Sequence, residues 1–134
     1  NYYLSFILVS LLFVSAYSQI NIQWESRHTS AGFNVDAAKS IALDDSNNVY
    51  VTGTSYVNTT SGFDIVTIKY NNAGVQQWLR TYSGAGNGID EGRDIYVDAN
   101  RNTYVCGYMT NGSGNFDYIT IKYDPSGTQL WATP

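Results

Sequence analysis

The stretch from Phe63 to Trp78, FDIVTIKYNNAGVQQW, decides the fold because the chain repeats it as FDYITIKYDPSGTQLW from Phe116 to Trp131. Phe, Asp, Thr, Ile, Lys, Tyr, Gly, Gln and Trp keep their places in both copies. Upstream, the segment Ile41–Gly53 returns as Ile95–Gly107, 54 residues later. The quoted copies lie 53 residues apart, because the second unit is one residue shorter before this stretch. The sequence therefore contains two similar units.

Each unit is predicted to form four short strands. Tyr, Thr, Val and Ile are frequent in strands, whereas Gly, Asn and Asp favour the turns between them. The chain has 12 Tyr, 12 Gly and only 2 Pro, and no long helical periodicity interrupts this pattern. The expected strands are 38–43, 48–55, 63–70 and 75–82 in the first unit, and 92–97, 102–108, 116–123 and 128–131 in the second. The predicted fold class is all-β.

Both faces of the strand at 63–70 are apolar or aromatic. Phe63, Ile65 and Thr67 lie on one face, and Val66, Ile68 and Tyr70 lie on the other. An antiparallel sheet in a sandwich usually exposes one polar face to water. A propeller blade is covered on both faces by its neighbours, and a repeat of about this length with four strands is typical of blades. The units are therefore predicted to be β-propeller blades of four antiparallel strands, spanning 38–82 and 92–132.

A further strand is expected at Ile20–Arg27, where apolar and polar residues alternate. Trp24 precedes Trp78 by 54 residues, so this leading strand is interpreted as the outermost strand of an earlier unit. About two blades plus one leading strand are fewer than the four or so blades that a closed propeller needs. We expect further blades from a longer chain, of which this would be the N-terminal part, or from self-association.

These units resemble the bacterial seven-bladed β-propeller repeat, the SBBP repeat. In the first unit the resemblance rests on Ser40-Ile41-Ala42-Leu43-Asp44, Asn48-Val49-Tyr50-Val51-Thr52-Gly53, Phe63-Asp64, Lys69-Tyr70, Gly74 and Trp78. In the second it rests on Ile95, Val97-Asp98, Asn102, Tyr104-Val105, Gly107, Phe116-Asp117, Lys122-Tyr123, Gly127 and Trp131. The resemblance implies a propeller fold in a secreted or surface protein of a bacterium, and it implies no single activity.

Residues 1–18, NYYLSFILVSLLFVSAYS, have the pattern of a secretory signal peptide. The apolar run from Phe6 to Val14 is short for a membrane span, and small residues at 16 and 18 predict cleavage before Gln19. No Lys or Arg precedes Arg27, so the basic start of such a signal is missing. The expected product is a partial propeller at 19–134 without a stable membrane span. We expect it to be extracellular, on the cell surface or in the periplasm.

The composition excludes several functional classes. Charged residues make up only 13% of the chain and the net charge is -4, which argues against a nucleic-acid partner. With one Cys and one His, a disulfide, a zinc set and a serine–histidine triad are not expected. The acidic cluster at 44–48 is interpreted as a turn and not as a cation site. We therefore expect no catalytic residue, metal or cofactor, and no enzymatic activity in this chain.

The candidate binding surface is one rim of the blades. Tight turns are expected at 44–47, 71–74, 98–101 and 124–127, and the long loops at 29–37, 56–62, 83–91 and 109–115 then fall together on the opposite rim. Loops on a rigid scaffold carry most binding sites. The candidate ligand-binding residues are Asp36, Lys39, Tyr56, Asn58, Asp90, Glu91, Arg93, Tyr108 and Asn111.

Two aspartate patterns on these blades recur. Asp36 precedes Lys39 as Asp90 precedes Arg93, which indicates ligand contacts at the rim, structural ion pairs or loop caps between the blades. Asp64 recurs as Asp117, and both are expected to accept loop N–H groups at a strand start.

The sequence favours a binding or scaffold module for a glycan or protein ligand. The alternative is the propeller part of a larger secreted enzyme, either a quinone-dependent dehydrogenase or a glycan-active enzyme. A glycan-active enzyme would need a pair of carboxylates drawn from Asp36, Asp90 and Glu91. An assembly platform at the outer membrane is a third interpretation.

Overall fold

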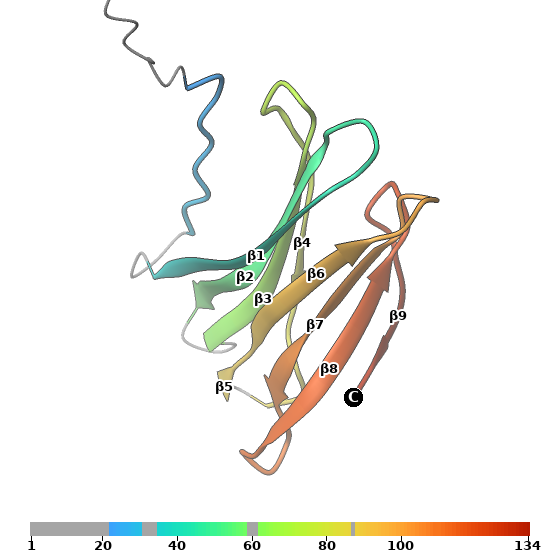
Figure 1. Ribbon diagram of the computed structural model, residues 1–134. Coiled ribbons are helices and arrows are strands. Elements are labelled where there is room, and N and C mark those ends of the chain that lie inside the picture. The colour runs from blue at the N-terminus through green and yellow to red at the C-terminus, as the bar shows by residue number, and fades with distance from the viewer. Residues whose placement is uncertain (1–21, 31–34, 59–61, 87) are drawn as a thin grey trace, which may run out of the picture.

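Two antiparallel sheets lie side by side in the computed structural model, which describes residues 22–30, 35–58, 62–86 and 88–134 (Figure 1). The first sheet contains β1 (Asp36–Leu43), β2 (Val49–Asn58), β3 (Gly62–Tyr70) and β4 (Gln76–Tyr82), in that order. The second contains β6 (Glu91–Val97), β7 (Thr103–Thr110), β8 (Phe116–Tyr123) and β9 (Gln129–Thr133), again in chain order. The described residues thus form two neighbouring four-stranded blades, as predicted.

A short strand that the sequence did not predict, β5 (Gly88–Ile89), pairs in parallel with the start of β3. It brings the connection between the blades back alongside Gly62 and Phe63. No helix among the described residues is long and apolar enough to cross a membrane. The predicted signal segment 1–18 lies outside the described residues.

The four tight turns use the same side-chain chemistry. A carboxylate or amide oxygen at the first turn position accepts backbone N–H groups two and four residues later, which replaces hydrogen bonds lost where the strands end. The pairs are Asp44 with Ser46 and Asn48, Asn71 with Ala73 and Val75, Asp98 with Asn100 and Asn102, and Asp124 with Ser126 and Thr128. These bonds confirm the interpretation of the acidic cluster at 44–48 as a turn.

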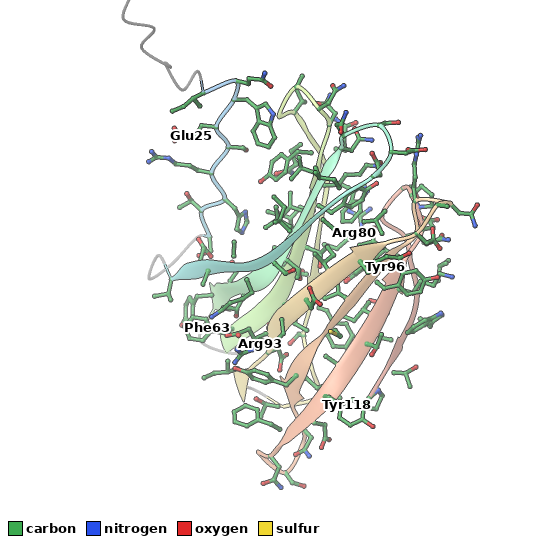
Figure 2. All side chains as sticks on the ribbon, viewed as in Figure 1. Glu25, Phe63, Arg80, Arg93, Tyr96 and Tyr118 are labelled. Carbon is green, nitrogen blue, oxygen red and sulfur yellow. The ribbon has the colours of Figure 1, made fainter. Side chains whose placement is uncertain are left out.

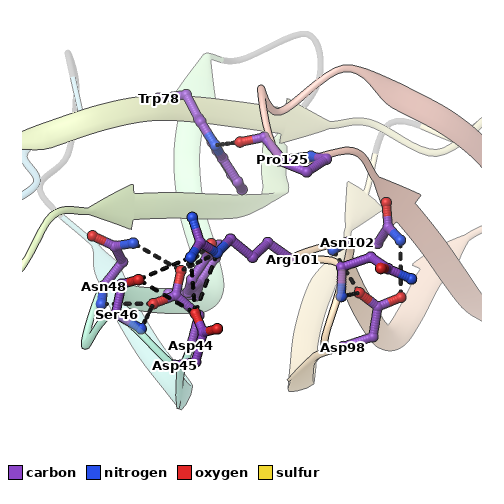
Figure 3. A network of polar contacts seen from close by, with 11 residues as sticks. Asp44, Asp45, Ser46, Asn48, Trp78, Asp98, Arg101, Asn102 and Pro125 are labelled. Atoms are coloured by element: carbon purple, nitrogen blue, oxygen red, sulfur yellow. Dashed lines mark hydrogen bonds and ion pairs between the residues drawn. The ribbon is translucent and has the colours of Figure 1, made fainter.

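Arg101 links two of these turns across the boundary between the blades. Its Nη2 donates to Asp45 Oδ1 at 3.0 Å and to Ser46 Oγ at 2.9 Å (Figure 3). Trp78 Nε1 donates to the carbonyl of Pro125 at 3.2 Å at the same end of the molecule. The tight-turn end is therefore fastened from one blade to the next.

Two connections at the opposite end are shorter than predicted. The strands β2 and β7 run on to Asn58 and Thr110, so the expected long loop at 109–115 is instead a tight turn at 111–115. Aromatic pairs hold the extended strand ends together, with ring centroids 5.3 Å apart for Tyr56 and Phe63 and 5.0 Å apart for Tyr108 and Phe116. Cross-strand aromatic contacts stabilise paired strands, and they prolong the ladder here.

The leading strand is absent from the described part of 20–27, because residues 22–30 form no strand. A fourth strand needs a third strand of its own sheet beside it, and no such neighbour pairs with this segment. The predicted equivalence of Trp24 and Trp78 is nevertheless correct. The Trp24 ring lies 5.9 Å from the Tyr70 ring, just as the Trp78 ring lies 6.0 Å from the Tyr123 ring.

The main core lies between the two sheets. Tyr50, Ile65 and Trp78 from the first sheet pack with a group of buried residues from the second. That group consists of Ile95, Val105, Met109, Ile119, Ile121 and Tyr123. Gly92 allows β6 to approach β2 of the first sheet, because a Cβ there would come within 2.3 Å of Thr52 Oγ1. The recurring tyrosines and tryptophans thus contribute to the packing between the blades, as Tyr50, Trp78 and Tyr123 do. The recurring phenylalanines, expected to do the same, instead pack on a tyrosine of their own blade.

Candidate functional site

The ends of β2 and β7 and the starts of β3, β6 and β8 lie together, opposite the tight turns (Figure 1). We call residues 56–58, 62–63, 83–86, 88–91 and 108–116 the loop rim. The longest loop among the described residues there is the connection from β4 towards β6, which carries Gly84, Gly86 and the short strand β5.

Lys39 and Arg93 occupy equivalent irregularities beside this rim. The register of β1 shifts between Ala38 and Ser40, and that of β6 shifts between Gly92 and Asp94. A β-bulge leaves one residue outside the regular ladder and redirects its side chain. Lys39 and Arg93 are those residues, so the bulges determine the direction of their charged side chains.

Both cations meet the same carboxylate. Lys39 Nζ lies 3.5 Å and Arg93 Nε 2.5 Å from Glu91 Oε1. The Arg93 guanidinium also lies 5.2 Å from the centroid of the Tyr108 ring. We call these four residues the bulge cluster, and Figure 2 labels Arg93 within it. The side chain of Glu91 is 9% exposed, while those of Lys39 and Arg93 are 36% and 58% exposed.

The two recurring ion pairs do not form, although the loop caps that the sequence equally allowed for Asp36 and Asp90 do. Lys39 does not pair with Asp36, and Arg93 does not pair with Asp90; both cations pair with Glu91 instead. Glu91 occupies the position of Ala37 in the first unit, so the repeat pattern did not indicate that both cations pair with this carboxylate. The cluster is therefore specific to the junction between these two blades.

Asp36 and Asp90 perform a different task, the same one in each blade. Asp90 is fully buried, and its carboxylate accepts hydrogen bonds from the backbone N–H groups of Thr110 and Gly84. Asp36 accepts the N–H of Ser30 at 2.9 Å and the hydroxyl of Ser55 at 2.6 Å. Each carboxylate closes the loop that precedes its blade.

The hydrogen bonds of Asp36 keep it ionised. Burial acts to raise the pKa of its carboxyl, but the bonds from Ser55 and Ser30 outweigh burial and leave that pKa below its usual value. A structural role of Asp36 as a loop cap follows.

A serine, a histidine and an aspartate come together near the start of β1, which the sequence reasoning missed because 27 residues separate His28 from Ser55. His28 Nε2 lies 3.4 Å from Ser55 Oγ. In a hydrolytic triad the serine donates to histidine and the acid orients that histidine. Here the Ser55 hydroxyl donates directly to Asp36 instead. The arrangement supports the loop and does not activate a nucleophile.

Of the other predicted rim residues, only Tyr108 belongs to the bulge cluster. Tyr108 joins the bulge cluster, and Tyr56 packs edge-on against Phe63. Asn58 ends β2 opposite Gly62, and its side chain lies outside the described part of the structure. The side-chain oxygen Oδ1 of Asn111 accepts the backbone N–H groups of Ser113 and Asn115, and its Nδ2 donates to Asp117 Oδ2 at 3.0 Å.

Asp64 and Asp117 do not share a role, although both recur in the sequence. Asp117 is exposed, whereas Asp64 is 4% exposed and its Oδ1 has no hydrogen-bond partner among the described residues. Burial raises the pKa of the Asp64 carboxyl, a hydrogen bond from Ser83 partly offsets that rise, and the charge of Asp90 adds to it. Asp64 is thus a buried acid close to a second buried acid at the rim.

A family model described as SBBP, beta-propeller repeat, matches residues 29–58 and 77–117, more than half of the chain. The matched ranges cover β1 and β2 of the first blade and continue from β4 into β8. A search of curated proteins returned no match. The two four-stranded blades and the family match agree, and the chain therefore belongs to the SBBP β-propeller repeat family.

Proposed function

We propose that this protein is a secreted or cell-surface binding module that contacts a glycan or protein ligand through the loop rim. The observation that carries the proposal is the bulge cluster, in which two partly exposed cations share one buried carboxylate. Glu91 balances one of the two positive charges, and most donors of Arg93 and Lys39 have no partner among the described residues, since Arg carries five N–H donors and Lys three. The signal pattern at 1–18 supports export.

The cluster suits an acidic or hydroxyl-rich ligand group. Arg93 presents a planar donor array next to the Tyr108 ring, and guanidinium groups recognise carboxylates and phosphates with two parallel hydrogen bonds. Because Glu91 anchors both cations, they are positioned before the ligand arrives, which lowers the entropic cost of binding. We infer that uronic or sialic acids, or acidic protein segments, are the best first probes.

The same geometry supports binding over glycoside hydrolysis. Of the three candidate carboxylates, Asp36 and Asp90 each accept two hydrogen bonds within their own blades. Glu91 is paired with two cations. A hydrolase needs one carboxyl free to donate a proton and another free to attack or to activate water.

The test is a glycan array and a panel of acidic peptides, followed by titration of any hit with variants. Arg93→Ala is expected to weaken binding about tenfold, the usual cost of one charge-assisted contact. Arg27→Ala is the matched control, because Arg27 is equally cationic, 83% exposed and paired with an exposed Glu25. Equal affinity of the two variants for every hit would refute the role of the cluster.

A further inference from the structure

A second feature of the loop rim is a small apolar surface at the junction between the two blades. Tyr56 at the end of β2 and Phe63 at the start of β3 pack edge to face, with ring centroids 5.3 Å apart and planes at 70°. Ile89 of β5 pairs with Phe63 in parallel. Ile89 is 43% exposed, and the two aromatic residues are partly exposed. We call Tyr56, Phe63 and Ile89 the apolar strip.

The backbone that carries Ile89 is fixed, although its side chain is exposed. The Ile89 N–H donates to Thr110 Oγ1 at 2.9 Å, and the same hydroxyl donates to the Ile89 carbonyl at 3.0 Å. The following N–H, that of Asp90, donates to the Phe63 carbonyl at 2.7 Å. The Ile89 side chain is therefore positioned before a ligand arrives, which lowers the entropic cost of a contact with it.

The apolar strip lies next to the bulge cluster. Ile89 ends β5 and Glu91 begins β6, with one residue between them, so their Cα atoms are about 7 Å apart if this segment is extended. Lys39 and Arg93 both contact the Glu91 carboxylate. Figure 2 labels Phe63 and Arg93 on this side of the molecule. A ligand placed over Ile89 and Phe63 therefore has the two cations within reach.

The combination of features, and not the aromatic pair alone, distinguishes this junction. Tyr108 and Phe116 repeat the aromatic pair in the second blade, where it prolongs a ladder, so the pair by itself serves the fold. The carboxylate that gathers the cations does not recur, because the counterpart of Glu91 in the first unit is Ala37. An exposed aliphatic side chain, an aromatic ring and a pair of cations thus lie together here. They fit a ligand that has both an apolar face and an anionic group.

We propose that the apolar strip and the bulge cluster together bind a uronic-acid residue of an acidic polysaccharide. This inference rests on the proposed function and names the ligand class of the same rim. A hexuronic acid carries C–H groups on the faces of its pyranose ring and a carboxylate at the edge of that ring. The ring face lies on Phe63 and Ile89, and the carboxylate accepts hydrogen bonds from Arg93 and Lys39.

An acidic protein segment fits the same surface less well. A stable contact between proteins buries about 800 Å² on each partner, around a well-packed apolar centre. The apolar strip consists of three side chains, and two of them are already covered in part by each other. This area suits a single sugar ring, whose hydroxyl groups can remain in water around it.

The test is calorimetric titration of the full chain with an oligogalacturonate, its methyl ester and an oligoglutamate peptide. The oligogalacturonate is expected to bind. The ester, which lacks the charge, and the peptide, which lacks the ring, should each bind at least tenfold more weakly. Ile89→Ser should weaken oligogalacturonate binding about tenfold, because it removes most of the aliphatic surface under the ring. Val75→Ser is the matched control, since Val75 is 57% exposed on a tight turn at the opposite end.

Saturation-transfer NMR of the wild type is a second measurement that needs no variant. The ring C–H protons on one face of the sugar should receive the most saturation, and an even distribution would overturn the inference. Oligogalacturonate binding that Arg93→Ala weakens and Ile89→Ser does not would also overturn it, as would a peptide that binds as tightly, but the proposed function would then stand. An oligogalacturonate that does not bind refutes the inference, and the proposed function falls with it only if the glycan array and the acidic peptides also give no hit.

Discussion

Single residues set the spacing between the blades. Gly74 and Gly127 end the third-to-fourth strand turns with φ of 80° and 83°, and each lies directly beneath a tryptophan ring. The sequence showed Gly and Trp recurring together, but only the structure shows that each Trp packs on the Gly of the following blade. The recurring Gly therefore serves both the turn and the neighbouring tryptophan.

Replacing Gly127 by Ala should cost about 2–4 kcal/mol of unfolding free energy, because the residue has a positive φ and a Cβ would lie 2.8 Å from the Trp78 ring. Gly114→Ala is the matched control, with a φ of 79° and nothing within 4 Å of the new Cβ. That control should cost only about 1 kcal/mol. Urea denaturation measures both, and equal losses would show that the Trp78 contact is unimportant.

Asp64 provides a pH-dependent test at the same scale. Its pKa is raised in the folded state, so the folded chain holds its proton more tightly and Asp64 costs stability once pH rises above the folded pKa. Asp64→Asn should therefore stabilise the protein at pH 7, and the gain should vanish below pH 3.8, the ordinary pKa of an aspartate side chain.

Asp98→Asn is the opposite control. Hydrogen bonds from Asn102 are the main cause that lowers the pKa of Asp98, so its ionised form stabilises the fold and loses that effect as pH falls through the folded pKa. Asp98→Asn should destabilise at pH 7. Urea midpoints at pH 7 and pH 3 measure both variants, and shifts of the same sign at pH 7 would contradict this assignment.

At the scale of elements, loop caps and bulges decide where the rim side chains lie. The connection from β4 to β6 is closed by Asp90, which accepts two backbone N–H groups while fully buried. The bulges at Lys39 and Arg93 then turn two cations towards Glu91. The rim is built by backbone irregularities, which the pattern of strands does not reveal.

Asp90→Ala should cost about 2–4 kcal/mol, because it leaves two buried N–H groups without an acceptor. Asp36→Ala, in the equivalent loop of the first blade, should cost less, since Asp36 is only half-buried. Thermal melting of both variants beside the wild type would measure the difference. Equal melting temperatures for the two variants would show that the burial of Asp90 adds nothing.

At the scale of the molecule, stability depends on the contact between neighbouring blades. Repeat proteins gain much of their stability from the interfaces between units. Trp78 lies in that interface, whereas Trp131, at the same place in the next unit, is 41% exposed. We therefore expect Trp78 to contribute more to the free energy of unfolding than Trp131.

Trp78→Ala should cost about 3–5 kcal/mol, as expected for a large aromatic side chain in a core. Trp131→Ala should cost less than half of that, because Trp131 is already partly in water. Chemical denaturation of both variants beside the wild type compares the two losses. Similar losses would mean that the contact between the blades contributes little.

The sequence alone determined the period, the strand pattern, the turns and the family, because these follow from local propensities and from a motif repeated in register. It also predicted correctly that Trp24 corresponds to Trp78. The prediction of a leading strand was wrong, because a strand requires a neighbouring strand to pair with, and the local sequence pattern does not show whether one is present. The prediction of a long loop at 109–115 was wrong, because the contact between the Tyr108 and Phe116 rings extends the pairing of β7 with β8.

Only the tertiary structure decided which of the predicted rim residues meet. Lys39 and Glu91 are 52 positions apart in the sequence, and they lie together because β1 and β6 are the inner strands of adjacent blades. The rim aspartates were equally recognisable in the sequence, but hydrogen bonds within the loops occupy Asp36 and Asp90. Residues that recur in both units serve the structure of each blade, and the sequence reveals them by their repetition. The contacts at the junction depend on residues that differ between the two blades, and only the packing of one blade on the other brings those residues together.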